Sequence, residues 1–225
     1  MTPAHPGPLA LVGGAEWRER CTFDADLLAM SGGTEVLVLP TAAAYEHPAR
    51  SVEAATAHFA SLGGTVRGLM VLARPDAEDA ANAEAVRAAR FIYLGGGSPL
   101  HLRSVLKDSA VWQALEEAWQ AGAVLAGSSA GAMVLGDPMV DPRGGAFTVG
   151  LGLVERLAVL AHADHWSAEK LHRTFGLATG GVRIVAVDEQ TALLREPGGL
   201  WRAVGAGGVS VYVDGQPAGL DALAG

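Results

Sequence analysis

Short apolar runs alternate with longer helical patterns along the first 126 residues of the chain. A short apolar run that is bounded by glycine or proline predicts a buried strand, whereas an alanine-rich or amphipathic stretch predicts a helix. Strands are predicted at residues 8–12, 35–39, 66–72, 91–94 and 123–126. Helices are predicted at residues 49–61, 76–89 and 100–120, the last in two pieces. This alternation predicts βαβ units and a mostly parallel sheet that helices cover on both faces.

The second half of the chain has a less regular pattern. Strands are predicted at residues 157–161 and 184–187, with a helix at residues 167–175 between them. The segments 192–194, 200–204 and 209–213 predict a closing antiparallel set with tight turns. Because no repeat or long linker interrupts the 225 residues, we expect one α/β domain that spans residues 1–225.

Composition and net charge limit the kinds of molecule that the protein is expected to bind and the compartment in which it is expected to work. The formal net charge is −8 and the sequence pI is about 5.3, which argues against nucleic acid and anionic membranes as main partners. No apolar stretch reaches the roughly 18 residues of a membrane-spanning helix, and the first residues do not resemble a signal peptide. The single cysteine, Cys21, cannot form an internal disulfide. We therefore expect a cytoplasmic protein, and no metal or other cofactor is implied.

The segment Gly-Ser-Ser-Ala-Gly at residues 127–131 follows a predicted strand and precedes a plausible helix start. A G-x-S-x-G turn at that place holds the central serine exposed at the carboxyl edge of the sheet. This pattern predicts that Ser129 is a nucleophile and that the backbone N–H of Ala130 donates to a developing oxyanion. The five residues are also compatible with an ordinary loop or a phosphate-binding loop.

A run of glycines at residues 95–97 ends the predicted strand 91–94. The carboxyl end of that strand lies on the same sheet edge as the nucleophile turn if the sheet is parallel. Backbone N–H groups of Gly96 or Gly97 are therefore candidates for the second oxyanion donor, although the glycines taken alone favour an ordinary strand-end turn.

A nucleophilic serine needs a base, and the base needs a carboxylate to orient it. Among seven histidines, His165 is the preferred base because it follows the buried strand 157–161. Two pairs of acidic residues compete as the acid. Glu189 and its neighbour Asp188 end the strand 184–187, while Asp137 and Asp141 lie in a loop rich in proline and glycine. A carboxylate at a strand end is held more firmly, so Glu189 is preferred.

A metal site formed by His162, His165 and Glu169 is a weaker interpretation. These residues would share a face only if the whole segment were helical, and the residues before it predict a strand.

Six segments resemble the peptidase E and cyanophycinase family of serine peptidases, in the family's order. They are Leu-Val-Gly-Gly-Ala-Glu at 11–16, Tyr-Leu-Gly-Gly-Gly at 93–97, Gly-Ser-Ser-Ala-Gly-Ala at 127–132, Gly-Leu-Gly-Leu-Val at 150–154, Asp-His-Trp at 164–166 and Val-Asp-Glu-Gln-Thr-Ala-Leu-Leu at 187–194. The resemblance implies a three-layer α/β/α fold of the class I glutamine-amidotransferase type. It also implies a Ser–His–Glu triad, which falls on Ser129, His165 and Glu189.

The resemblance further implies hydrolysis of small peptides through an acyl-enzyme. The oxyanion donors would be the N–H groups of Ala130 and Gly97, with Gly96 as the fallback. Dimers are common in that family, so a homodimer is compatible with the resemblance.

The chain departs from the cyanophycinase pattern after the histidine. The resemblance implies the cyanophycinase motif Asp-Gln-His-Phe followed by regularly placed arginines. In this chain Glu169 and Leu171 stand where basic residues are expected. The substrate-binding residues that remain as candidates are Asp164, Arg143 and Arg173. Cyanophycin is therefore not the expected substrate, and a strict preference for N-terminal aspartate is not indicated.

Two rival functions use the same residues. An α/β-hydrolase esterase shares G-x-S-x-G, but its acid precedes its histidine in the chain, the reverse of the order preferred here. A catalytically silent binding or regulatory relative would keep the fold without an assembled triad. A glutamine amidotransferase is disfavoured because its nucleophile is a cysteine and Cys21 lies far from the nucleophile turn in sequence.

Overall fold

The computed structural model describes residues 5–143 and 146–223. Its main sheet has seven strands in the order β13-β12-β1-β5-β4-β2-β3. The strands β1, β5, β4, β2 and β3 pair in parallel, whereas β12 pairs antiparallel with β1 and β13 pairs antiparallel with β12 at one edge. Their bounds are β1 Leu9–Val12, β2 Glu35–Leu39, β3 Thr65–Gly68, β4 Phe91–Leu94, β5 Val124–Ser128, β12 Thr191–Arg195 and β13 Trp201–Gly205.

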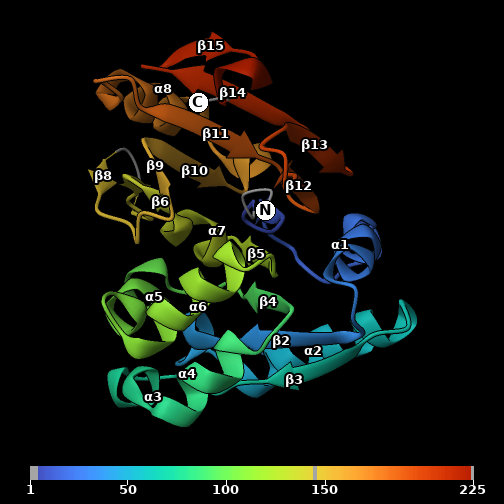
Figure 1. The fold of residues 1–225 in the computed structure, drawn as a ribbon. Helices are drawn as coiled ribbons and strands as arrows, with labels where there is room; N and C mark the ends of the chain where they lie inside the picture. Colours follow the sequence, from blue (N-terminus) through green and yellow to red (C-terminus); the bar gives the residue numbers. More distant parts are fainter. Residues whose placement is uncertain (1–4, 144–145, 224–225) are drawn as a thin grey trace.

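Helices cover both faces of this sheet, so the fold is the predicted three-layer α/β/α arrangement (Figure 1). Alternate side chains of β1 point to opposite faces of the sheet. Leu9 and Leu11 belong to one apolar cluster, which α3–α7 complete, while Ala10 and Val12 belong to the cluster that contains α1 and α2. The helices are α1 Phe23–Ser31, α2 Pro48–Ser61, α3 Arg74–Glu78, α4 Ala80–Arg87, α5 Pro99–Leu106, α6 Ala110–Gln120, α7 Ala130–Leu135 and α8 Ala168–Leu177.

A second sheet is the main departure from the predicted architecture. It has the order β15-β14-β11-β10-β6-β9, and it lies at the orange-to-red end of the molecule with α8 (Figure 1). Its strands are β6 Gly136–Asp137, β9 Val154–Glu155, β10 Leu157–Ala161, β11 Arg183–Val187, β14 Val209–Val213 and β15 Gln216–Ala218; a separate pair joins β7 Met139–Val140 to β8 Phe147–Thr148. The sequence predicted the strands at 157–161 and 184–187 but not that they leave the main sheet.

Local capping explains how two predicted helices divide. The predicted helix 76–89 is broken at Asp79, whose side chain accepts the N–H groups of Ala81 and Asn82 and so begins α4. Ser109 begins α6 in the same way by accepting the N–H of Trp112, which gives the two predicted pieces of 100–120. These caps fix the residues at which α4 and α6 begin.

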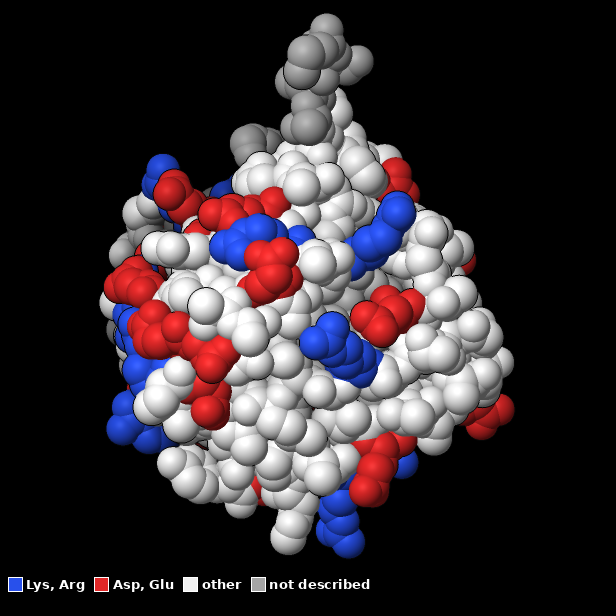
Figure 2. Space-filling view, turned by 60° about the horizontal axis from the view of Figure 1, so that its bottom comes forward, with Lys and Arg blue, Asp and Glu red and all other residues white. Residues whose placement is uncertain are grey.

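The predicted strand 66–72 is shorter than expected, since β3 ends at Gly68. None of the helices in the described ranges has both the length and the apolar character that crossing a membrane requires. The face shown in Figure 2 is mostly uncharged, and most of its lysines and arginines lie beside acidic side chains rather than forming a continuous basic band.

Candidate active site

Ser129 occupies the sharp turn between β5 and α7. Its backbone has φ 49° and ψ −110°, a conformation that costs a non-glycine residue about 1–3 kcal/mol. Two contacts hold it there: the Ser129 N–H donates to Val12 O at 2.9 Å, and Ser129 O accepts the N–H of Met133 at 2.9 Å. The turn therefore presents the hydroxyl at the carboxyl edge of the sheet, as the G-x-S-x-G pattern predicts.

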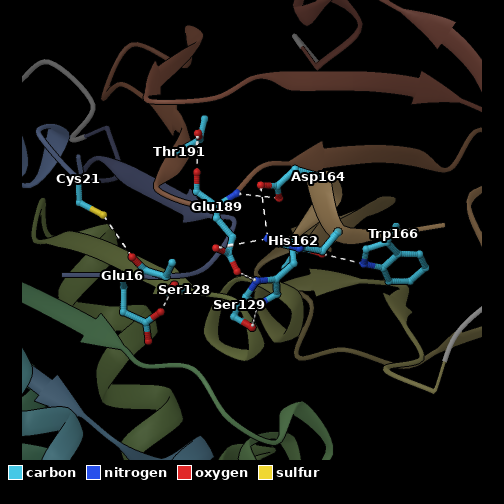
Figure 3. Close-up of polar contacts among 12 residues, drawn as sticks. Glu16, Cys21, Ser128, Ser129, His162, Asp164, Trp166, Glu189 and Thr191 are labelled. Carbon is cyan, nitrogen blue, oxygen red and sulfur yellow. Dashed lines mark hydrogen bonds and ion pairs between the residues drawn. The ribbon is translucent and has the colours of Figure 1, made fainter. Parts of the chain in front are cut away.

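A continuous chain of hydrogen bonds leads from this serine to a carboxylate (Figure 3). His162 Nε2 lies 2.9 Å from Ser129 Oγ, and His162 Nδ1 lies 2.8 Å from Glu189 Oε1. His162 is the first residue after β10, and Glu189 lies in the connection from β11 to β12. Nucleophile, imidazole and carboxylate are thus aligned in the geometry of a hydrolytic triad.

The loop after β1 holds the histidine and the acid together. Gly13 O accepts the N–H of His162 at 2.7 Å, and Gly14 O accepts the N–H of Gln190 at 2.9 Å. Gly14 has φ 131°, and a Cβ at this position would lie 2.1 Å from Cε1 of the His162 ring. Only glycine leaves room for the imidazole to lie across the loop and reach Ser129.

The two backbone N–H groups that the sequence favours as oxyanion donors have no acceptor within the described residues. Ala130 is the first residue of α7, so its N–H has no partner inside the helix. Gly97 follows β4, and its N–H makes no hydrogen bond in the described part of the chain. Gly96 differs, because its N–H donates to Glu16 Oε1 at 2.9 Å.

Comparison with known proteins assigns the chain to a family. The model of peptidase family S51 matches residues 9–200. The chain belongs to peptidase family S51. Two similar curated relatives are the cyanophycinases of Synechococcus elongatus and Thermosynechococcus vestitus, each 26% identical over 92% of this chain and 68% of the relative. The S51 match makes the protein a serine-type peptidase.

Two solved structures are similar to this chain in fold. A peptidase from an acI-B1 Actinobacterium superposes with a TM-score of 0.82 at 30% identity, covering 94% of this chain and 91% of that one. A Listeria monocytogenes EGD-e protein, described as a candidate peptidase E, shares the fold with a TM-score of 0.66 at 19% identity, covering 92% and 98%.

The structure does not bring His165, the histidine preferred from the sequence, to the serine of this S51 peptidase. His165 ends the short 3-10 turn Ala163–His165, where its N–H donates to His162 O at 2.9 Å and its side chain is 65% exposed. This turn carries the chain away from Ser129 directly after His162. The available sequence signal was position: His162 immediately follows the apolar strand 157–161, just as Ser129 immediately follows β5.

The other sequence candidates have separate partners. Asp141 is tied to Arg143 at 2.6 Å, and this guanidinium lowers the pKa of the carboxyl to about 2. Arg173 pairs with Glu169 at 2.8 Å along α8. Both arginines are therefore occupied by exposed ion pairs, and Glu169 does not join His162 and His165 in a metal site.

Asp164 lies beside the acid rather than apart from it. Its Oδ1 accepts the backbone N–H of Glu189 at 3.1 Å (Figure 3). This contact anchors the start of the connection that carries Glu189. The substrate-binding role predicted for Asp164 stays a prediction.

Glu16 is a site residue for which the sequence analysis proposed no role. Its Oε2 accepts the hydroxyl of Ser128 at 2.8 Å and its Oε1 accepts the N–H of Gly96. One carboxylate therefore ties the nucleophile strand to the glycine loop after β4. Glu16 also lines a cavity of about 550 Å³, with Trp17, Arg18, Arg50 and His58 on its other sides.

Cys21 does not take part in nucleophilic chemistry. Its thiol is buried and donates to Ala15 O at 3.6 Å, and burial, as the largest cause, raises its pKa to about 11. A thiol that stays protonated at neutral pH is a poor nucleophile. This agrees with the expectation that the chain is not a cysteine-dependent amidotransferase.

Proposed function

We propose that this S51 peptidase hydrolyses short peptides through a Ser129–His162–Glu189 triad. The observation that carries the proposal is the hydrogen-bond chain from Ser129 Oγ through both ring nitrogens of His162 to Glu189 Oε1. Neither His165 nor Asp141 offers an equivalent contact within the described residues.

The first half of the reaction forms an acyl-enzyme. Ser129 Oγ attacks the peptide carbonyl carbon while His162 Nε2 takes the hydroxyl proton. Glu189 stabilises the imidazolium that results. The tetrahedral oxyanion is placed to accept the N–H groups of Ala130 and Gly97, and its collapse releases the amine, which receives the proton from His162.

The second half regenerates the enzyme. Water gives a proton to His162 and attacks the acyl carbon, and collapse of this second intermediate returns the proton to Ser129 Oγ and releases the acid. The preference for short peptides rests on the resemblance of the sequence motifs to the peptidase E and cyanophycinase family and not on a specific contact. Cyanophycin is not the proposed substrate, since Glu169 offsets the charge of Arg173 on α8.

A fluorophosphonate probe tests whether the serine is activated. We expect mass spectrometry to find the label on Ser129 of the unsubstituted protein. His162→Ala should lower the labelling rate by roughly 10³-fold or more because the general base is lost. His165→Ala is the matched control and should keep most of the labelling. Equal loss in both histidine variants, or a dominant loss in His165→Ala, would reject the assignment of His162.

A catalytically silent relative is the remaining alternative. It would leave Ser129 unlabelled in a protein that circular dichroism shows to be folded. Labelling combined with cleavage of esters but of no peptide would instead favour an esterase.

A further inference from the structure

Asp164, His165 and Glu189 form a second cluster of titratable side chains on the solvent side of the triad acid. Each residue contributes one atom, and the three atoms lie within 4.8 Å of one another. Within the residues that the structure describes, no other group of three or more histidine, cysteine or acidic side chains meets that spacing. The side chains are 40%, 65% and 29% exposed, so ions in solution can reach them.

The atoms that converge are those that hydrogen bonds leave unused. Oδ1 of Asp164 accepts the Glu189 N–H, and Oε1 of Glu189 faces His162. This leaves Oδ2 of Asp164 and Oε2 of Glu189, which lie 3.7 and 3.5 Å from Nε2 of His165. Both separations exceed the usual N–H···O range of about 2.7–3.2 Å.

The same separations suit ligands of one small cation. Zinc binds histidine nitrogen and carboxylate oxygen at about 2.0–2.2 Å in tetrahedral geometry, which puts neighbouring ligand atoms about 3.4 Å apart. The two observed distances require adjustments of only a few tenths of an ångström. Two carboxylates with one imidazole also supply the charge and the donor types that a divalent transition-metal ion takes.

We propose that Asp164, His165 and Glu189 bind a divalent transition-metal ion, for which Zn²⁺ is the probe, and that the bound ion inhibits the peptidase. The ion would take Oε2 of Glu189 and draw negative charge away from Oε1. Glu189 would then stabilise the imidazolium of His162 less, and turnover would slow. The inhibition rests on the proposed function, whereas binding of the ion does not.

Binding is measured first, without turnover. Zinc chloride is titrated by calorimetry into Ser129→Ala protein from which any affinity tag has been removed, in a buffer that does not coordinate metals. We expect one equivalent to bind, and His165→Ala in the same background to weaken binding at least about tenfold. His172→Ala is the matched control, because His172 is an exposed histidine of α8 outside the cluster.

Absence of saturable binding, or equal affinity in the His165→Ala and His172→Ala proteins, would overturn the site. Because His165 is exposed, the substitution leaves the core intact, and His165→Gln provides a second variant with an uncharged side chain that retains polarity. Mg²⁺ at the same concentrations should not bind, since an imidazole ligand disfavours it.

Inhibition is measured next on the active protein. Zn²⁺ should slow peptide hydrolysis at least about tenfold and excess EDTA should restore it, while His165→Ala should need about tenfold more Zn²⁺ for the same effect. Equal inhibition of both proteins would overturn the regulatory role, because the ion would then act elsewhere, for example at His162. Zinc binding by a protein that cleaves no peptide would leave the metal site standing and reject the proposed function.

Discussion

His162 and Glu16 show how single side chains prepare this site before substrate arrives. His162 is fixed at three points, by its two ring nitrogens and by its backbone N–H on Gly13 O. Glu16 uses both carboxylate oxygens to join Ser128 to Gly96. This second contact occupies the Gly96 N–H, whereas that of Gly97, the proposed oxyanion donor, has no acceptor within the described residues. We therefore propose that Glu16 positions the glycine loop after β4, which carries the proposed oxyanion donor.

Replacement of Glu16 tests that role. Glu16→Ala leaves the buried hydroxyl of Ser128 and the N–H of Gly96 without their acceptor, so the loop after β4 loses its fixed position. We expect kcat to fall roughly 10–100-fold while KM changes by less than about threefold, because a small displacement of oxyanion donors acts mainly on the transition state.

Glu16→Gln is the conservative control for this prediction. Its amide oxygen can accept the Gly96 N–H and its NH2 group can donate to the Ser128 hydroxyl, so it should recover most of kcat. A rise in KM at constant kcat for Glu16→Ala would indicate substrate binding instead of positioning.

At the scale of elements, β5, the nucleophile turn and α7 fit against β4 with almost no free space. A Cβ on Gly131 would lie 2.2 Å from the carbonyl oxygen of Leu94, which belongs to the backbone of β4 and cannot rotate away. The close packing of α7 on the sheet supports the strained turn at Ser129, in addition to its two backbone hydrogen bonds. The small residues around the nucleophile are therefore a packing requirement between neighbouring elements.

Gly131→Ala sets helix propensity against this packing. Alanine favours a helix by about 1 kcal/mol over glycine, but overpacking costs up to about 3 kcal/mol. Since the clash is with backbone, we expect a net loss of about 2 kcal/mol in the free energy of unfolding, measured by urea denaturation.

Gly176→Ala in α8 is the matched control. A Cβ there meets nothing within 4 Å, so the substitution should stabilise the protein by about 0.5–1 kcal/mol. Stabilisation by Gly131→Ala as well would show that α7 can move away from β4.

At the scale of the whole molecule, the site forms where the two sheets meet. Ser129 follows β5 of the main sheet, His162 follows β10 of the second sheet, and Glu189 lies where the chain passes from β11 in the second sheet to β12 in the main one. Which carboxylate lies beside His162 is thus a consequence of how the sheets are joined. Asp141, which lies between β7 and β8, is paired with Arg143.

Glu189→Gln and Asp141→Asn compare the two candidate acids. Glutamine preserves the shape of Glu189 but cannot stabilise an imidazolium, so kcat should fall by about 10³–10⁴. Asp141→Asn removes an ion pair with the largely exposed guanidinium of Arg143, away from the proposed triad, and activity should stay within about twofold of the unsubstituted protein. The two kcat values at saturating peptide decide the matter, and the reverse order would make Asp141 the acid.

Much of the fold and part of the site followed from local patterns. Apolar runs bounded by glycine and proline located β1, β2, β4 and β5, because burial on both faces demands such runs. The edge strand β3 is only partly buried, and the run that predicted it extends beyond its end at Gly68. The nucleophile turn was equally local, since its sterics involve residues within a few positions of Ser129. Glu189 was preferred for a similar reason, as a carboxylate held at the end of a buried strand.

Only the tertiary structure decided which histidine faces the serine. His162 and His165 are three residues apart after the same strand, and the position of His162 directly after that strand does not by itself decide which one lies over Ser129. The answer depends on Gly13, nearly 150 positions earlier in the chain, whose carbonyl holds the His162 N–H, and on a 3-10 turn that directs His165 toward Glu189 Oε2. Contacts between residues so distant in sequence arise only when the two sheets pack together, and no local pattern encodes them.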